Sequence, residues 1–164
     1  MEIAKWSLEV KPNEANSHYL MAVAMGRITE ITGAKERVKS TPDIRKYFEA
    51  AVAIDPSHAG AWHGLGRWHY RLANLTLAER AAAAVLWGRL PSDASNEQAI
   101  ECFNKAVQSR SDYILYRLDL GIAYIKTNQE DLARRTLNAA VSMSAQTEDD
   151  PDYIEQAKAL LAKI

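Results

Sequence analysis

Apolar residues recur at spacings of three and four along almost the whole chain, and no long stretch alternates apolar and polar residues in twos. This spacing gathers apolar side chains on one face of an α-helix, whereas a strand would need period two. Glycine (7) and proline (5) are scarce, so few positions favour breaking a helix. The pattern predicts an all-α chain of about nine helices, near residues 2–10, 14–32, 41–54, 58–74, 76–89, 94–109, 112–127, 129–144 and 151–163.

The predicted boundaries coincide with residues that begin or end helices. A proline inside a helix removes a backbone donor and costs about 3 kcal/mol, so a proline-containing turn indicates a boundary. Four such turns occur, at Lys11-Pro12-Asn13, Asp55-Pro56-Ser57, Leu90-Pro91-Ser92 and Asp150-Pro151-Asp152. Predicted N-caps are Ser57, Ser92, Asn128 and Ser95, the last with Gln98 in a capping-box spacing, and Gly33 is predicted to end a helix.

Two stretches follow the tetratricopeptide (TPR) pattern, which has Trp, Leu, Gly and Tyr at fixed offsets on a first helix and Ala and Phe on a second. The first-helix matches are Trp62, Leu65 and Gly66, with His69 in place of Tyr, and then Leu120, Gly121 and Tyr124. Second-helix matches follow at Ala99, Phe103 and Ala106 and at Ala133, Leu137 and Ala140. The chain is therefore predicted to be a TPR-like solenoid of antiparallel helical hairpins, an α-α superhelix, in a single domain over 1–164.

Four segments depart from a regular array of hairpins. Residues 76–91 hold an additional, inserted helix, and residues 33–41 are predicted to lengthen a turn that is normally tight. Residues 2–10 are predicted as the second helix of an incomplete N-terminal repeat, and residues 151–163 as a C-terminal capping helix. Because an incomplete repeat exposes an apolar edge, we expect either a homodimer through that edge or its coverage by residues beyond this chain.

Particular runs within and around the repeats resemble a known family. They are WHGLGRWHY at 62–70, LANL at 72–75, Glu79-Arg80, LWGRLP at 86–91, AVAMGR at 22–27 and KER at 35–37. Over roughly residues 15–145 the chain resembles the regulator of microtubule dynamics family, and it looks more like the bacterial relatives. The resemblance implies a TPR-like domain. Animal members are associated with microtubules or with organelle contact sites, and one has a TPR domain linked to phospholipid binding and transfer.

The first helices of successive TPR repeats line a concave groove, and this arrangement predicts a binding surface. The residues placed there are Arg27, His63, Arg67, Tyr70, Arg71, Leu118, Ile122 and Lys126. They give the groove a cationic wall and an apolar wall. We expect a non-catalytic scaffold that binds a protein or peptide partner in this groove. The alternative is a lipid-binding or lipid-transfer module, and a further alternative is that the apolar wall is core beneath residues 151–163.

Other classes of function find little support in the sequence. The net charge of −1 argues against nucleic-acid binding, and the absence of an apolar run of roughly 20 residues argues against a membrane span. We therefore expect a soluble protein, in a compartment that the sequence leaves open. Carboxylate pairs occur at 130–131 and 149–150, where helix starts favour negative charge without catalysis.

The residue types that build metal sites and reactive centres are also sparse. No two histidines have the i, i+4 spacing of a helical metal site, so no metal, no cofactor and no enzymatic activity are predicted. Each of the four tryptophans is expected to be a packing residue rather than a contact for a partner: Trp6, Trp62, Trp68 and Trp87. Cys102 is the single cysteine and is expected to be a small core residue.

Overall fold

The computed structural model describes residues 1–31, 34–87, 91 and 93–164, with side chains placed outside residues 29–39 and 86–90. Within these residues the chain is all-helical, as the periodicity predicted, with nine helices and no strand. The helices are α1 (Glu2–Val10), α2 (Ala15–Ile31), α3 (Ala34–Ile54), α4 (Ala59–Ala73), α5 (Leu77–Trp87), α6 (Asn96–Ser109), α7 (Ile114–Lys126), α8 (Glu130–Val141) and α9 (Asp150–Leu161).

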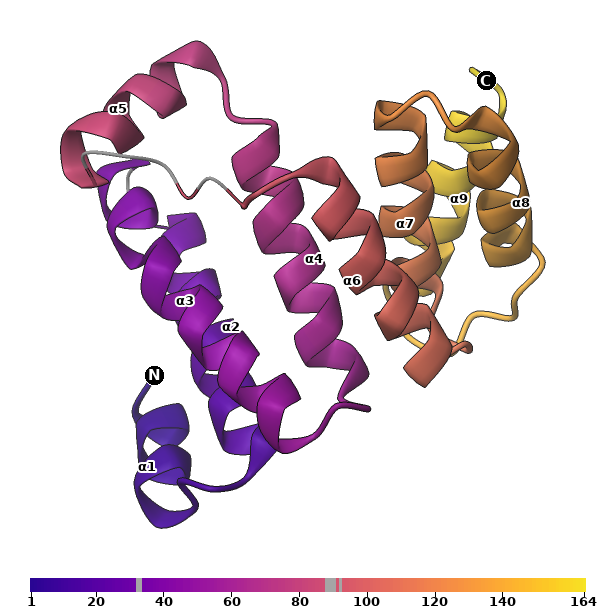
Figure 1. Cartoon of the computed structure of the whole chain (residues 1–164). Coiled ribbons are helices and arrows are strands. Elements are labelled where there is room, and N and C mark those ends of the chain that lie inside the picture. The colour runs from indigo at the N-terminus through magenta and orange to yellow at the C-terminus, as the bar shows by residue number, and fades with distance from the viewer. Residues whose placement is uncertain (32–33, 88–90, 92) are drawn as a thin grey trace.

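The helices stack as antiparallel pairs (Figure 1). Helix α2 packs along α3, α4 along α6, and α7 along α8, while α1 lies against α2 and α9 lies against both α7 and α8. Helix α5 comes between α4 and α6 in the chain but packs against α3 instead. The first helices of the pairs also touch one another, because α4 contacts both α2 and α7. We call the surface formed by α2, α4, α7 and α9 the first-helix face.

Glycines allow the two helices of a pair to approach closely. A Cβ added at Gly66 on α4 would overlap the ring of Phe103 on α6, and one added at Gly121 on α7 would lie 2.5 Å from Cδ2 of Leu137 on α8. Both partners are core residues, with Phe103 1% exposed. The consensus glycines therefore set the distance between paired helices, which is the role that the repeat pattern assigns to them.

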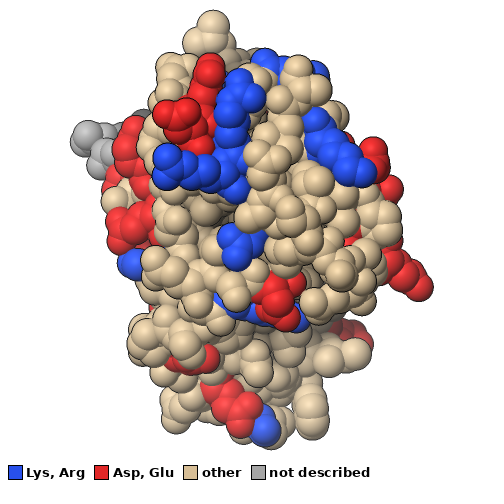
Figure 2. All heavy atoms as spheres, turned by 90° about the vertical axis from the view of Figure 1, so that its right-hand side faces the viewer, with Lys and Arg blue, Asp and Glu red and all other residues tan. Residues whose placement is uncertain are grey.

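Lys and Arg side chains alternate with Asp and Glu over the half of the molecule that holds α7, α8 and α9 (Figure 2). This agrees with the net charge of −1 for the chain. Selective attraction of a charged partner therefore has to come from local groups on the surface rather than from the field of the whole protein.

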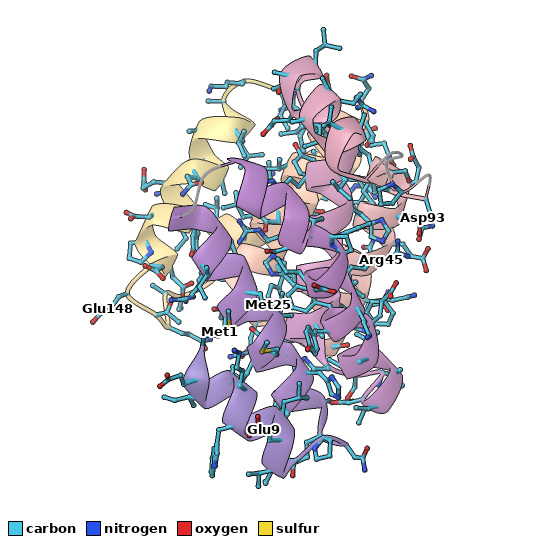
Figure 3. All side chains as sticks on the ribbon, turned by 90° about the vertical axis from the view of Figure 1, so that its left-hand side faces the viewer. Met1, Glu9, Met25, Arg45, Asp93 and Glu148 are labelled. Atoms are coloured by element: carbon cyan, nitrogen blue, oxygen red, sulfur yellow. The ribbon has the colours of Figure 1, made fainter. Side chains whose placement is uncertain are left out.

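A polar cluster holds the segment after α5 against α3. The guanidinium of Arg45 on α3 donates to both carboxylate oxygens of Asp93, at 3.1 and 2.6 Å, and to Glu49 at 2.6 Å (Figure 3). The same group lies 4.7 Å from the centroid of the Trp68 ring. The bidentate hydrogen bonds lower the pKa of Asp93 and raise that of Arg45. Such a planar, two-point contact fixes orientation as well as distance.

The helix ends confirm part of the predicted capping. The hydroxyl of Ser95 accepts from the backbone N–H of Gln98 at 3.2 Å, as the capping-box spacing predicted. Two predicted N-caps are wrong. His58, rather than Ser57, caps α4, and Gln129 precedes α8 because Asn128 adopts a positive φ of 57°. The predicted roles of Ser92 and Gly33 lie outside the described residues.

The lengthened turn predicted at 33–41 is wrong, because α3 already begins at Ala34 and includes Pro42. Proline supplies no N–H, so it leaves one hydrogen bond missing inside the helix. The indole N–H of Trp68 donates to the carbonyl of the neighbouring Thr41 at 2.9 Å, so α4 braces α3 beside the proline. Packing against the rest of the fold outweighs the local preference that suggested a turn.

The tryptophans differ in their surroundings. Trp68 is buried, and Trp62 is half-buried with its indole N–H donating to the carbonyl of Pro56 at 2.8 Å, so both are packing residues as predicted. The predicted packing role of Trp87 lies outside the described side chains. The packing role expected of Trp6 is wrong, because this side chain is 64% exposed on α1.

Candidate functional site

The centre of the first-helix face is a polar contact between α4 and α7. Nε2 of His63 lies 2.7 Å from Oδ2 of Asp119, and Nε of Arg67 lies 3.9 Å from the same oxygen. His63 is buried with its ring 4.6 Å from that of Tyr116, whereas the side chain of Arg67 is 62% exposed. Two predicted groove residues therefore lie together, joined by an aspartate that sequence reasoning missed.

The other cationic residues predicted for the groove are exposed. Arg27 on α2, Arg71 on α4 and Lys126 on α7 all have exposed side chains. Tyr70 is half-buried, and burial together with the nearby charge of Asp119 raises its pKa. These residues are accessible along three neighbouring first helices, although only Arg67 forms an ion pair with Asp119 among the described contacts.

The apolar residues predicted for the groove belong to the core instead. Leu118 is 2% exposed and packs in a cluster with Leu137 of α8 and Ala157 of α9. Ile122 packs against the same cluster, as do several apolar residues of α9. Leu118 is therefore inaccessible to a partner in this conformation, which agrees with the alternative that this wall is core beneath the last helix.

A shallow pocket of about 270 Å³ opens where α2, the first turn of α4 and the start of α7 meet. It is lined by Tyr19, His58, Ala59, Gly60, Arg110 and Tyr116. Gly60 keeps it open, because a Cβ there would lie 2.9 Å from ring atoms of Tyr19. None of these residues was predicted as a site residue. The available signal was the spacing of three between Tyr113, Tyr116 and Asp119, which puts them on one face of a helix.

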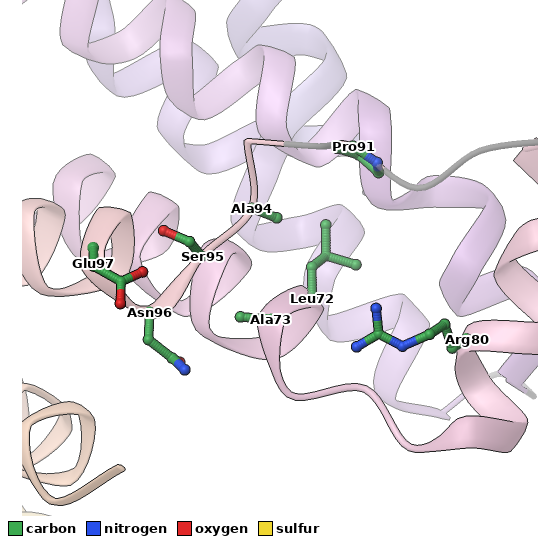
Figure 4. A pocket seen from close by; sticks show the side chains of 8 residues that line it. All are labelled: Leu72, Ala73, Arg80, Pro91, Ala94, Ser95, Asn96 and Glu97. Atoms are coloured by element: carbon green, nitrogen blue, oxygen red, sulfur yellow. The ribbon is translucent and has the colours of Figure 1, made fainter. Parts of the chain in front are cut away.

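A second pocket of about 250 Å³ lies where α4 ends and α6 begins. Figure 4 shows Arg80 extending from α5 towards Leu72 and Ala73 at the end of α4, with Ser95 and Glu97 on the opposite side. The carboxylate of Glu97 accepts from its own backbone N–H and from Ser95, and these hydrogen bonds lower its pKa. Glu97 therefore already satisfies the donors at the start of α6 that an anionic ligand would use.

No catalytic constellation emerges from the described residues. They hold no group of three or more His, Cys, Asp or Glu side chains that could bind a metal ion. Cys102 is buried, as expected of a core residue, and burial raises its pKa to about 11, so it is a thiol at neutral pH. Among the helices of the described residues, none is long and apolar enough to cross a membrane.

An apolar stripe lies open on α1. Ile3, Trp6 and Val10 are spaced three and four apart, and each is more than half exposed. Helix α1 packs on α2 through the buried Ala4, and beside it the hydroxyls of Ser7 and Ser17 lie 3.0 Å apart. Residues at such spacings share one helix face, so the stripe is contiguous.

Stacked antiparallel helix pairs, with no strand among the described residues, define an all-α protein. Within that class the family is specific, because the family model described as Regulator of microtubule dynamics protein 1-3 matches residues 1–164. The chain belongs to this family, as the runs in its sequence predicted. The description of the family model names regulators of microtubule dynamics.

Individual relatives are similar over nearly all of this chain. Regulator of microtubule dynamics protein 1 of Rattus norvegicus is 31% identical over 162 residues, which are 98% of this chain and 52% of the rat protein. The protein of the same name from Caenorhabditis elegans is 25% identical over 157 residues, or 96% of this chain and 69% of that protein. This chain thus spans about half the length of the mammalian relatives.

Proposed function

We propose that this chain is a non-catalytic scaffold that binds an acidic segment of a protein partner along the groove of its first-helix face. The observation that carries the proposal is that the side chain of Arg67 is exposed and only weakly paired. Its guanidinium is largely exposed, while its partner Asp119 is four-fifths buried and already bound to His63 at 2.7 Å. An ion pair of 3.9 Å at an exposed side chain contributes at most about 1 kcal/mol, so a partner carboxylate can compete for Arg67.

The surroundings of Arg67 extend this cationic surface. Arg27, Arg71 and Lys126 are exposed on α2, α4 and α7, so a segment lying across the three helices would meet a positive group on each. The names of the relatives concern the control of microtubule dynamics. A scaffold that acts through binding, without chemistry of its own, is consistent with a regulatory role of that kind.

Selection of peptides on the purified chain tests the groove and does not require the partner to be identified. We expect a phage-displayed random library to yield peptides enriched in Asp and Glu. Arg67→Glu should weaken the binding of these peptides about tenfold or more, because attraction becomes repulsion at the centre of the face. The measurement is the Kd of synthetic copies of the selected peptides.

The matched control reverses a charge elsewhere on the surface. Arg135 is exposed on α8, outside the first-helix face, so Arg135→Glu should leave the Kd unchanged. Far-UV circular dichroism should be the same for both variants. Peptides without acidic enrichment, or equal affinity for the Arg67→Glu variant, would contradict the proposal.

The lipid-binding alternative requires an apolar surface for an acyl chain. The wall predicted for this purpose contains Leu118, which is buried, and Ile122, which is half-buried, and both pack in the cluster under α9. The small apolar surface that they leave open favours the peptide. Native mass spectrometry distinguishes the two functions. A stoichiometric phospholipid retained by the purified chain would overturn the preference.

We also propose that the apolar stripe of α1 mediates self-association. Contiguous exposed apolar surface of this kind marks interaction sites, and three large side chains contribute to it. We expect light scattering to give a mass that rises above 18.3 kDa with concentration, and Trp6→Glu to hold it at that value. Leu132→Glu, which changes an exposed apolar residue on α8, should behave as the unaltered chain does. A monomer at all concentrations would refute self-association.

A further inference from the structure

We infer that the pocket between Tyr19, the first turn of α4 and Tyr116 binds a carboxylate group of the protein partner. This inference rests on the proposed scaffold function and adds a defined anchor point to it. The lining of the pocket includes residues at the start of α4 and just after the end of α6. Figure 1 shows that these two helix ends lie at the same end of the fold. The pocket contains none of the residues that the sequence predicted for the groove.

The first turn of α4 supplies backbone donors. Ala59 and Gly60 line the pocket, and their N–H groups make no hydrogen bond within the described part of the chain. The next N–H, that of Ala61, donates to Nδ1 of His58 at 3.1 Å. Free donors at the start of a 15-residue helix, together with its dipole, favour an anion at this point.

Tyr116 independently indicates a ligand. Its side chain is 6% exposed and lines the pocket, yet its hydroxyl has no hydrogen-bond partner among the described residues. Burial, reinforced by Tyr19 and Tyr113, raises its pKa to about 12, so the hydroxyl keeps its proton and can donate. The ring is buried while the hydroxyl is left without a protein partner, so an acceptor bound in the pocket can take a hydrogen bond from it.

Arg110 supplies the positive charge. It lines the pocket with its guanidinium carbon 4.7 Å from the centroid of the Tyr113 ring, which holds the group at the rim. Asp112 accepts a hydrogen bond from Nε of Arg110 at 3.4 Å, so the two terminal nitrogens of the guanidinium remain available for an anion. His58 adds no charge in this arrangement, because Nδ1 accepts from Ala61 and Nε2 is then left to donate to Asn16 at 2.9 Å.

The balance of charges favours a carboxylate over a phosphate. The lining offers one cationic side chain, Arg110, whose Nε is already paired with Asp112 at 3.4 Å, so it suits a singly charged group better than a doubly charged one. The rings of Tyr19 and Tyr116 line the pocket beside Gly60. An acidic side chain or a free C-terminus of the partner carries the single negative charge that this lining suits.

Titration of the isotope-labelled chain with small anions tests the pocket directly. We expect sodium acetate, at constant ionic strength, to shift the amide proton resonances of Ala59 and Gly60, and neutral acetamide to leave them unchanged. Arg110→Gln should weaken acetate binding about tenfold and Tyr116→Phe about threefold, because each removes one hydrogen bond to a charged acceptor. Arg135→Gln on α8 is the matched control and should bind acetate as the unaltered chain does.

Stability separates a ligand role of Tyr116 from a structural one. Since its hydroxyl is unpaired, Tyr116→Phe should leave the urea midpoint unchanged or raise it, and a lowered midpoint would contradict the inference. Equal shifts with acetate and acetamide would also overturn it. If glycerol 3-phosphate binds more tightly than acetate, the inferred ligand is wrong, and the pocket prefers a phosphate ester to a carboxylate. Acetate binding is measured without any peptide, so its failure is distinguishable from failure of the groove.

Discussion

Replacing Phe103 with alanine is expected to lower the free energy of unfolding by about 3–5 kcal/mol. The ring is 1% exposed and packs with Leu120 and Tyr124 of α7, and its centroid lies 5.6 Å from that of His63 on α4. It therefore joins three helices from two hairpins. Because these helices cannot all move inward, the substitution should leave a cavity at the joint between the hairpins.

Urea unfolding followed by circular dichroism measures this effect. Leu132→Ala on α8 removes an apolar side chain that is already exposed, so we expect a change within about 0.5 kcal/mol. A loss of less than about 1 kcal/mol for Phe103→Ala would show that the joint between the hairpins contributes little to stability. A broader transition with a smaller slope would show that the hairpins no longer unfold together.

Alanine at Gly66 is expected to destabilise the chain by about 1–3 kcal/mol, although alanine is the better helix former. The added methyl group would overlap the ring of Phe103, which is buried and has no free space into which to move. The gain in helix propensity, about 1 kcal/mol, is too small to offset this overlap. Unfolding in urea, measured in the same way, gives the sign of the change in the free energy of unfolding.

Gly26 provides the matched control, since it too lies within a helix but a Cβ built there meets no atom within 4 Å. Gly26→Ala should therefore stabilise the chain by about 0.5–1 kcal/mol. In a Phe103→Leu background, Gly66→Ala should cost less, because the smaller side chain leaves room for the methyl group. Equal effects at the two glycines would mean that α4 and α6 are not held at the distance seen here.

The fold could be predicted to a large extent, because each helix is encoded by residues close together in the chain. The predicted segments correspond to the observed helices within a few residues, except at α3. There the prediction placed a boundary next to Pro42, whereas the helix starts at Ala34 and runs through the proline. The local rule failed because packing on α4, including the hydrogen bond from Trp68 to Thr41, stabilises the helix on either side.

The candidate site could be predicted only in part. The repeat pattern identified Arg67 and His63 as neighbours on one helix face, but Asp119, which joins them, is 56 residues from His63. The pocket lined by Tyr19, Gly60 and Tyr116 likewise assembles residues from three separate helices. Leu118 matched the groove position in the repeat pattern, yet α9 covers it. A repeat pattern describes contacts within and between repeats, so it does not predict which helix covers the last one.

The sequence alone determined that this chain is all-helical, where most helices begin and end, which glycines bring helices together, and to which family it belongs. These features follow from spacings of three and four and from residue types at fixed offsets, so they depend on interactions within one or two helices. Only the tertiary structure decided which groove residues are open, that Asp119 occupies the centre of the face, and that a pocket with an unpaired tyrosine hydroxyl lies at its end. Those properties depend on how side chains from distant helices meet, and a difference of one side chain or one covering helix changes them without altering any local pattern.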